Sequence, residues 1–367
     1  MAEWESTVEM LVNYVNPDPN FWRGRRVALT GHTGFKGSWM ALLLTQLGAQ
    51  VYGYALAPAT TPNLFSDAKV AELIDSQIGD VRDLAALSAW MERVQPEIVL
   101  HFAAQALVRQ SYLDPVDTMT SNFLGTLHVL EAARTQASIR SMVIVTTDKV
   151  YRNNESGQAY RETDHLGGHD PYSASKAACE ILVSSYKLSF LQHLGVATAR
   201  AGNVIGGGDW AADRLLPDAV RAWKESQTLE IRRPDSIRPW QHVLEPLCSY
   251  LVLAQKMFSN VELGQAYNFG PNLTDAVSVR DVIELAQGVF GAGTTQFAEQ
   301  VAGPHEAGLL HLDTSLAQEK LGIRPRWPLA TAIEKTMGWY KAYLEKADAR
   351  RLCVTDIQAY LALARSD

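Results

Sequence analysis

Residues 26–37 read RVALTGHTGFKG, and this stretch decides the fold. A short apolar run from Arg26 to Thr30 ends in a turn with glycine at positions 31, 34 and 37, and apolar residues follow at helical spacing from Trp39 to Leu44. Small residues let a backbone approach a pyrophosphate, and a helix N-terminus directs amides and a positive dipole at it. The GxxGxxG spacing alone also occurs as plain packing, but its place between a strand and a helix favours a dinucleotide site. The residues expected to contact the dinucleotide here are Gly31, Thr33, Gly34, Phe35 and Gly37.

The alternation of strands and helices continues outward from this turn. Further strands are predicted at 50–55, 74–78, 98–102, 141–146 and 196–200, with helices at 84–94, 117–135 and 173–194. Such alternation predicts βαβ units, and largely apolar strands fit a parallel sheet that is covered on both faces. The expected fold class is α/β, a Rossmann-type doubly wound parallel sheet with a smaller C-terminal α/β lobe for the substrate.

Four parts of the chain are predicted. The regular pattern starts at Arg25 and loosens after residue 205, where glycine, proline and arginine become frequent. The parts are an N-terminal arm at 1–24, a dinucleotide-binding domain at 25–205 with a return segment at about 236–265, an interleaved substrate lobe at 206–345, and a C-terminal helical part at 346–367.

Composition excludes several classes of protein. The chain has 367 residues, 47% of them hydrophobic, and a net charge of −7. This apolar content predicts a folded protein, and the acidic balance argues against a nucleic-acid partner. Cys179, Cys248 and Cys353 form no CxxC pair, so neither a disulfide scaffold nor a structural zinc site is expected, and no metal is predicted. No run of 18 apolar residues and no signal peptide is present, so we expect no membrane partner and a cytoplasmic location.

The cofactor type is left open by the second strand. An acid that reads the ribose normally follows the turn by about 20 residues. The sequence at 54–58 is YALAP, with neither an acid nor a base for a 2′-phosphate, so NAD and NADP both remain. Asp80, with Val81, follows the third strand and either bonds the adenine or caps the next helix. Ala103 and Ala104 follow the fourth strand and are small enough for a cofactor ribose to pass.

Two segments after the fifth strand predict the chemistry. Tyr172 and Lys176 are spaced i, i+4 and share one helix face, so the ammonium, together with a positively charged nicotinamide, is expected to lower the pKa of the phenol. Tyr172 can then act as a base while hydride leaves the same carbon. Thr147, Asp148 and Lys149 follow the fifth strand directly, where ligands bind in parallel sheets. An acid and an amine beside the tyrosine favour proton transfer over a plain capped turn.

These segments resemble the extended short-chain dehydrogenase/reductase family, and within it the nucleotide-sugar 4,6-dehydratases, over roughly residues 25–340. Four strings resemble the pattern of the dehydratases that act on CDP-D-glucose: GHTGFKGSW at 31–39, RAGNVIGGGDW at 200–210, RPWQHVLEP at 238–246 and PHE at 304–306. The Thr-Asp-Lys triplet differs from the Thr-Asp-Glu of the dTDP-glucose enzymes.

The resemblance implies NAD as cofactor and a CDP-hexose as substrate. Tyr172, with Lys176, would take the 4-hydroxyl proton while C4 gives hydride to NAD, and Thr147 would bond the 4-oxygen. Lys149 would take the C5 proton, Asp148 would protonate the departing 6-hydroxyl, and hydride would return to C6. Asn203 would meet the substrate diphosphate, Arg232 and Arg238 suit bidentate phosphate binding, and Arg109 is a candidate neighbour of the active site.

Several alternatives stay open. Lys149 either is a base with a depressed pKa or stays charged, stabilises the enolate and relays the proton through water. A nucleotide-sugar 4-epimerase would not need the Asp148–Lys149 pair, and a non-catalytic NAD-sensing protein would not keep Tyr172 with Lys176. A dehydratase for another nucleotide hexose also fits. Relatives pair through the helices at about 105–134 and 173–194, which implies a homodimer or tetramer. The apolar stripe of Leu182, Val183, Tyr186 and Phe190 belongs to that interface or packs on the sheet.

Overall fold

The computed structural model describes residues 14–154, 157–272, 276–298 and 310–363. The PHE string at 304–306 lies outside these residues. The strands of the central sheet are β1 (Arg26–Thr30), β2 (Gln50–Ala55), β3 (Asp75–Ile78), β4 (Ile98–His101), β5 (Ser141–Val145), β7 (Gly195–Ala201) and β11 (Ala266–Phe269). The helices are α1 (Pro19–Trp22), α2 (Phe35–Gln46), α3 (Leu64–Asp67), α4 (Leu84–Val94), α5 (Val108–Leu113), α6 (Pro115–Met119), α7 (Gly125–Arg134), α8 (Pro171–Ser189), α9 (Leu215–Lys224), α10 (Leu244–Ser259), α11 (Val279–Phe290), α12 (Ser315–Leu321), α13 (Leu329–Leu344) and α14 (Ala349–Ala362).

The seven strands form one parallel sheet in the order β11-β7-β5-β4-β1-β2-β3. The chain fills one half from β1 to β3 and then returns to place β4 beside β1, so the order reverses between these two strands. This is the point at which ligands bind in doubly wound sheets, and the glycine turn follows β1 directly. The predicted fold class and all six predicted strands are confirmed, and β11 is a seventh strand that the sequence pattern did not predict.

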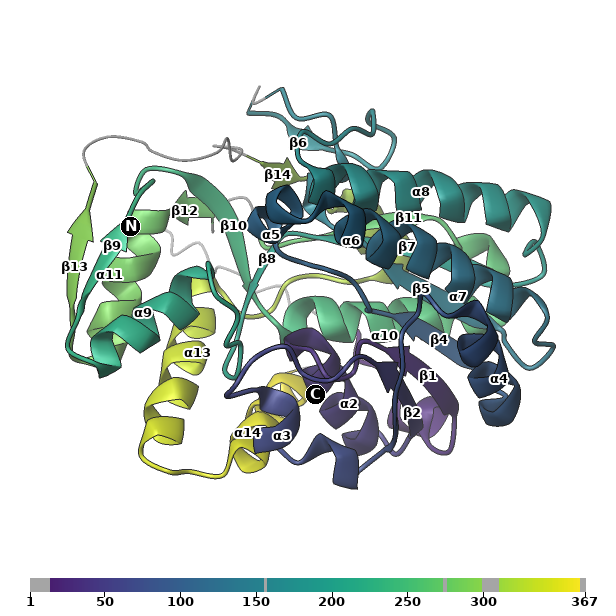
Figure 1. Ribbon diagram of the computed structural model, residues 1–367, viewed down its shortest axis with the longest axis horizontal. Helices are drawn as coiled ribbons and strands as arrows, with labels where there is room; N and C mark the ends of the chain where they lie inside the picture. Colours follow the sequence, from purple (N-terminus) through teal and green to yellow (C-terminus); the bar gives the residue numbers. More distant parts are fainter. Residues whose placement is uncertain (1–13, 155–156, 273–275, 299–309, 364–367) are drawn as a thin grey trace, which may run out of the picture.

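Side chains alternate between the two faces of the sheet and build two cores. Val27 and Leu29 of β1 belong to the core on one face, whereas Ala28 belongs to the core on the other. Helices α2 and α10 cover the first face and α4, α7 and α8 cover the second (Figure 1). Because both faces are covered, the central strands are buried along their length, as their apolar runs predicted.

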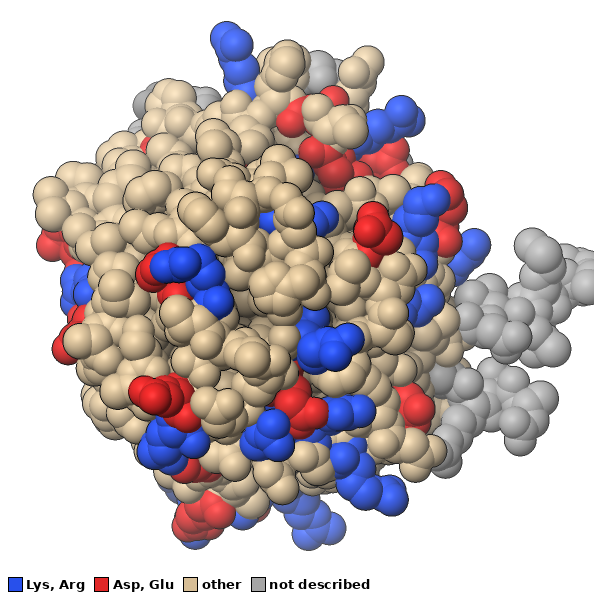
Figure 2. Space-filling view, turned by 90° about the vertical axis from the view of Figure 1, so that its right-hand side faces the viewer, with Lys and Arg blue, Asp and Glu red and all other residues tan. Residues whose placement is uncertain are grey.

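Two predicted helices have different bounds in the structure. The helix predicted at 117–135 is divided into α6, a π-helical turn at Thr120–Leu124 and α7. Helix α8 ends at Ser189 rather than at residue 194, and the helix of the part predicted at 346–367 spans Ala349–Ala362. None of the helices in the described ranges is long and apolar enough to cross a membrane. Figure 2 shows the side of the molecule that lies at the right of Figure 1. Few charged side chains are present in the upper left of this view.

Smaller sheets form the lobe beside the cavity. They are β8 (Asn203–Ile205) with β10 (Ile237–His242) and β12 (Ala276–Ser278), β9 (Thr228–Ile231) with β13 (Thr294–Phe297), and β6 (Ala159–Tyr160) with β14 (His311–Leu312). Within the predicted return segment, α10 packs on β5 and β7.

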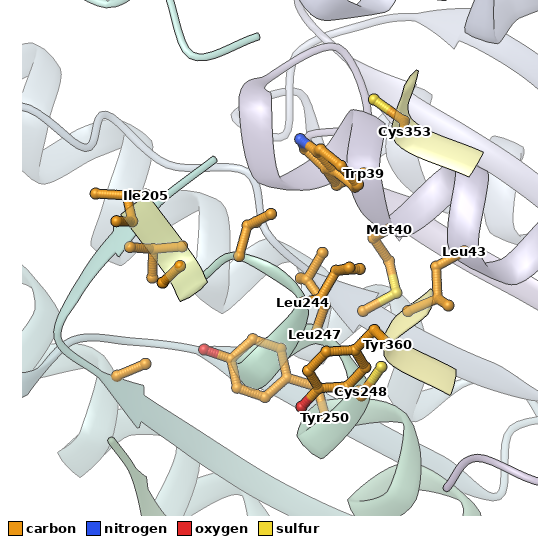
Figure 3. Packing of buried hydrophobic residues seen from close by; sticks show 14 of the residues in the cluster. Trp39, Met40, Leu43, Ile205, Leu244, Leu247, Cys248, Tyr250, Cys353 and Tyr360 are labelled. Carbon is orange, nitrogen blue, oxygen red and sulfur yellow. The ribbon is translucent and has the colours of Figure 1, made fainter. Parts of the chain in front are cut away.

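The last helix joins the main core. Trp39 and Met40 of α2, Leu247 of α10 and Tyr360 of α14 lie together in one buried cluster (Figure 3). Two hydrogen bonds connect this core to the loop after β8: the Trp39 indole donates to the Gly207 carbonyl at 2.9 Å, and the Tyr340 hydroxyl donates to the Asp209 carbonyl at 2.5 Å. The helix that follows the glycine turn is therefore bonded directly to the lobe.

Candidate active site

A cavity of about 1280 Å³ opens at the carboxyl ends of the central strands. Its walls come from the segments that follow β1, β4, β5 and β7 and from the lobe. Every residue predicted for the site lines it: Gly31, Thr33, Gly34, Phe35, Gly37, Asp80, Val81, Ala103, Ala104, Arg109, Thr147, Asp148, Lys149, Tyr172, Lys176, Asn203, Arg232 and Arg238. Residues spread over more than half of the chain thus meet in one space.

The three glycines of the turn do different things. Gly31 has φ +78°, and a Cβ there would lie 2.6 Å from the Ala103 nitrogen. A Cβ on Gly37 would lie 2.0 Å from the Gly31 carbonyl oxygen, so both positions need glycine for packing inside the protein. Gly34 is exposed, lines the cavity and is the N-cap of α2 without a side-chain cap. The helix amides there remain available to an anion.

The end of β2 carries no charged side chain that could bind the hydroxyls of a ribose. The Thr33 hydroxyl donates to the Leu56 carbonyl at 2.8 Å, which joins the glycine turn to this strand end. Asp80 lines the cavity and forms an ion pair with Arg82 at 2.6 Å, and hydrogen bonds from Arg82 lower the pKa of Asp80. The N-cap of α4 is Asp83, which accepts from the Ala86 amide at 3.0 Å, so the capping alternative for Asp80 was wrong.

Tyr172 and Lys176 lie on the first two turns of α8 and are both buried. Burial raises the pKa of Tyr172 to about 12, while a hydrogen bond with Thr147 acts in the opposite direction. The Lys176 ammonium donates to the Val145 carbonyl at 2.9 Å, and burial lowers its pKa. Burial outweighs the nearby charges in the protein alone, and the lowering of the phenol pKa by Lys176 together with a positively charged nicotinamide stays a prediction.

Asp148 and Lys149 form an ion pair at the wall of the cavity. The Lys149 Nζ lies 3.2 Å from the Asp148 Oδ1, which also accepts from the Thr147 hydroxyl at 2.9 Å. The Asp148 side chain is 3% exposed and that of Lys149 is 23% exposed.

A buried ion pair beneath this segment was missed by the sequence analysis. Glu180 lies one helical turn beyond Lys176 and accepts from Arg200 of β7 at 2.8 Å. It also accepts from the Thr146 hydroxyl at 2.5 Å and from the Thr198 hydroxyl at 2.6 Å. These contacts fix the start of the Thr147–Lys149 segment against α8. No local sequence motif predicts these contacts, because the partners lie far apart in the sequence.

The side of the cavity predicted to hold phosphate is rich in arginine. Arg109 of α5 forms an ion pair with Asp213 of the lobe at 2.8 Å, and Arg232 lies 3.6 Å from the same carboxylate. Asn203 and Arg238 lie on β8 and β10. Lys36, Asp209 and Arg214 also line the cavity and were not predicted as site residues.

In the described part of the chain, no group of three or more His, Cys, Asp or Glu side chains lies close enough together to hold a metal ion. All three cysteines are buried free thiols.

Comparisons with known proteins agree with this geometry. A family model described as GDP-mannose 4,6 dehydratase matches residues 29–336. A CDP-glucose 4,6-dehydratase of Salmonella typhimurium is 44% identical over 352 residues, which cover 94% of this chain and 98% of that protein. A UDP-glucose 4-epimerase of Thermus thermophilus, solved with NAD, is 26% identical with a TM-score of 0.75 and covers 86% of this chain and 99% of its own. A dTDP-glucose 4,6-dehydratase of Bacillus anthracis, also solved with NAD, shares the fold with a TM-score of 0.74 at 20% identity, over 88% of this chain and 98% of its own.

Proposed function

Because the chain belongs to the family that the GDP-mannose 4,6 dehydratase model describes, we propose that it is an NAD-dependent lyase that converts CDP-D-glucose to CDP-4-keto-6-deoxy-D-glucose and water. The relative that is 44% identical over nearly the whole chain carries this activity in its name. In the structure, one observation carries the proposal: the Asp148–Lys149 pair shares a cavity with Tyr172 and the glycine turn. An epimerase, which expels no hydroxyl, would have no use for this pair.

The residues present fit NAD. Gly34 leaves the N-terminus of α2 uncapped and open to the cavity, as a pyrophosphate requires. Gly31, Thr33, Phe35 and Gly37 would complete that cradle, with Ala103 and Ala104 beside a ribose and Asp80 and Val81 near the adenine. The two solved relatives described above hold NAD. When bound, NAD supplies the hydride acceptor for the sugar C4 and the hydride donor for C6.

Tyr172 acts as the base of the first step. Its phenol is buried beside Thr147, and Thr147 would bond the 4-oxygen of the sugar. A phenol whose pKa is raised to about 12 by burial needs positive charge nearby to give up its proton. Lys176, fixed on the Val145 carbonyl, supplies positive charge, and a bound oxidised nicotinamide would add to it. Deprotonation is thereby confined to the cavity with the cofactor in place.

Asp148 and Lys149 carry out the elimination with one shared proton. Transfer of a proton from the Lys149 Nζ to the Asp148 Oδ1, across 3.2 Å, turns the ion pair into an amine and a carboxylic acid. The amine takes the C5 proton, which the 4-ketone has made acidic, and the acid protonates the departing 6-hydroxyl as water. The pair then returns to ammonium and carboxylate.

Substrate contacts are proposed for the arginine-rich side of the cavity. Asn203, Arg232 and Arg238 would hold the diphosphate, with Arg109 close by. Asp213 bonds Arg109 and Arg232 in the structure, so a diphosphate would replace a carboxylate that these arginines already bind.

An isotope experiment tests the reaction. CDP-D-glucose carrying deuterium at C4 is converted, and the product is analysed by mass spectrometry and NMR. Deuterium at C6 of the same molecule is expected. Loss of deuterium to solvent, or its retention at C4, contradicts the mechanism.

A panel of CDP-, dTDP-, UDP- and GDP-glucose tests the nucleobase preference. Alkali-induced absorbance of the 4-keto product separates dehydration from 4-epimerisation.

The assembly is proposed to be a homodimer or a tetramer, built on the face of α5, α6 and α8. The predicted stripe is mostly packing, because Val183 is buried in the core with Leu182 and Tyr186 against it, while Phe190 is 51% exposed. Other large apolar side chains are more exposed and extend the surface: Leu113 at 80%, Val116 at 70%, Ile181 at 62% and Leu188 at 66%. Contacting helices with such residues are suited to an interface between copies. Sedimentation of the wild type and of Leu188→Glu should show a larger species only for the wild type.

A cytoplasmic location is part of the proposal. Cys179, Cys248 and Cys353 are buried as free thiols, which suits a reducing compartment.

A further inference from the structure

His101 is a buried histidine that connects two layers of the protein. It is the last residue of β4, its side chain is buried, and it does not line the cavity. Its Nδ1 lies 2.7 Å from the hydroxyl of Thr30, and its Nε2 lies 3.0 Å from the hydroxyl of Thr126. Thr30 ends β1 directly before the glycine turn, whereas Thr126 lies on α7, the helix beside α8 (Figure 1). The ring therefore joins the strands on the cofactor side to the helices on the other face of the sheet.

The partners of the ring decide which of its nitrogens carries the hydrogen. The Thr30 hydroxyl accepts from the two backbone amides that follow β4, at 3.1 and 3.2 Å, so its own hydrogen is left to donate to Nδ1. The Thr126 hydroxyl donates its hydrogen to the Asn122 carbonyl at 2.7 Å, so it accepts from Nε2. Both ends require the same neutral ring, with its hydrogen on Nε2. Burial favours this neutral form, because it lowers the pKa of His101 to about 3.

Asn122 extends the connection to the helix that carries the catalytic tyrosine. It is fully buried in the π-helical turn between α6 and α7. Its side-chain amide donates to the Ser175 hydroxyl at 2.8 Å, and its carbonyl also accepts from the Cys179 thiol at 3.3 Å. Ser175 and Cys179 lie one turn apart on α8, and Lys176 stands between them in the sequence. The π-helical turn therefore holds α8 at two points beside the Tyr172–Lys176 pair.

Hydride transfer depends on the distance between the two layers that this series of bonds joins. The sugar must contact Tyr172 through its 4-oxygen and the dinucleotide through C4 at the same time. In the proposed function the dinucleotide lies against the turn after β1 and the loop after β4, while Tyr172 comes from α8. Each hydroxyl in the series has a single hydrogen, so the loss of one bond leaves a buried group on the next residue without its partner.

We propose that His101 is a positioning residue of the hydride-transfer site, which holds the helix of Tyr172 at a fixed place relative to the cofactor by donating a hydrogen bond to Thr126. This inference rests on the proposed function, which places NAD on one side of the series and the sugar beside Tyr172. Because His101 does not line the cavity, its loss should slow the chemical step and leave substrate binding nearly unchanged.

The kinetic test breaks the link between the ring and α7 from both of its ends. His101→Asn keeps an acceptor for Thr30 but is too short to reach Thr126, and Thr126→Val removes the hydroxyl from a side chain of the same shape. Each should lower kcat about tenfold and leave the KM for CDP-D-glucose within about twofold. The double variant should lose no more than either single variant, because both break the same link. His101→Gln, whose longer side chain carries a donor to Thr126, should recover most of the turnover.

The chain offers a matched control in Thr336. Like Thr126, it is buried on a helix, and it donates to the carbonyl four residues before it, that of Ala332, at 2.7 Å. It lies on α13 and does not line the cavity. Thr336→Val should therefore lower the free energy of unfolding as Thr126→Val does, in urea denaturation, but it should leave kcat unchanged.

A spectroscopic measurement tests the direction of the bonds without any turnover. Nitrogen-15 NMR of protein labelled on histidine distinguishes a ring nitrogen that carries hydrogen from one that does not. The signals of His101 are those that disappear in His101→Asn, or in His101→Gln where the shorter variant does not fold. Hydrogen on Nε2 is expected.

Three results would overturn the inference. They are hydrogen on Nδ1 of His101, a normal kcat in Thr126→Val despite a loss of stability equal to that of Thr336→Val, and losses in kcat that add in the double variant. Because Thr126→Val leaves the histidine in place, it tests the link even where His101→Asn does not fold. Failure of the proposed function looks different, because the wild-type protein itself would then not convert CDP-D-glucose.

Discussion

The glycine turn and the catalytic segment Thr146–Lys149 meet in one cavity but are fixed by different forces. At the turn, Gly31 and Gly37 face backbone atoms at distances that admit no side chain. At the catalytic segment, position depends on buried charge, since Glu180 holds Thr146 while it pairs with Arg200. Gly31 and Gly37 on the cofactor side therefore tolerate no added volume, and the catalytic side depends on its buried charges and hydrogen bonds.

Replacing Tyr172 by Phe separates the two regions most clearly. The change removes the proposed base, so turnover should fall about a thousandfold, while NAD affinity stays within about twofold because the turn is untouched. Steady-state kinetics and a binding titration check this. Tyr186→Phe, on the same helix but bonded to Glu131 outside the site, is the matched control. Appreciable turnover in Tyr172→Phe would remove the tyrosine from the mechanism.

Glu180→Gln tests whether charge holds the catalytic segment. The substitution keeps the shape but leaves Arg200, whose side chain is 4% exposed, without a buried counter-charge. We expect a loss of about 3 kcal/mol in the free energy of unfolding, measured by urea denaturation, together with reduced turnover. Glu131→Gln, an exposed pair with Arg134, should change stability by less than about 0.5 kcal/mol. Equal effects of the two variants would refute the contrast.

Gly37→Ala tests whether volume holds the turn. The added Cβ would lie 2.0 Å from the Gly31 carbonyl oxygen, so the turn must shift, at a cost of about 1–3 kcal/mol. NAD affinity should fall with it. Gly34→Ala adds the same atom where the nearest protein atom is 3.5 Å away, so its stability should be close to that of the wild type. Thermal unfolding with and without NAD distinguishes the two variants.

Acid should lower the free energy of unfolding, because two buried histidines on the cofactor side of the cavity resist protonation in the folded protein. Burial lowers the pKa of His32 to about 4 and that of His101 to about 3, and His101 bonds Thr30 at 2.7 Å. Both values lie below the ordinary value of 6.5, so the unfolded chain binds more protons as the pH falls below 6.5. Stability should decrease by up to about 1.4 kcal/mol per pH unit for each histidine, down to the folded values. His101→Gln should have a shallower decrease than the wild type when unfolding is followed between pH 7 and 5.

The sequence predicted the regular half of the fold because its signals are local. Most of the six predicted strands are apolar runs that alternate with helices of recognisable period, and the glycine turn joins the first strand to the first helix. Strand β11 was not predicted because Ala266–Phe269 follows a stretch without regular alternation of strands and helices. Its pairing with β7 is a long-range contact that no local pattern records.

The candidate site was predictable where a motif fixes the spacing. Tyr172, Lys176 and the Thr147–Lys149 segment all reached the cavity. Glu180 and Arg200 were missed because their pairing is made by the fold, and Lys36 because a residue between two motif glycines reads as a spacer. The pKa of Tyr172 could not be foreseen either, since its direction depends on burial.

The bond from the Trp39 indole to the Gly207 carbonyl has a consequence for how ligands enter. It ties the cofactor helix to the lobe loop on one rim of the cavity, and the Tyr340 hydroxyl reinforces that rim. Elsewhere on the cavity wall, the lobe contacts α5 through charge, because Asp213 pairs with Arg109 and also lies near Arg232. The first connection is made by hydrogen bonds between buried groups, whereas the second is made by partly exposed ion pairs. Because salt screens exposed ion pairs, we expect substrate binding and product release to quicken as the ionic strength rises.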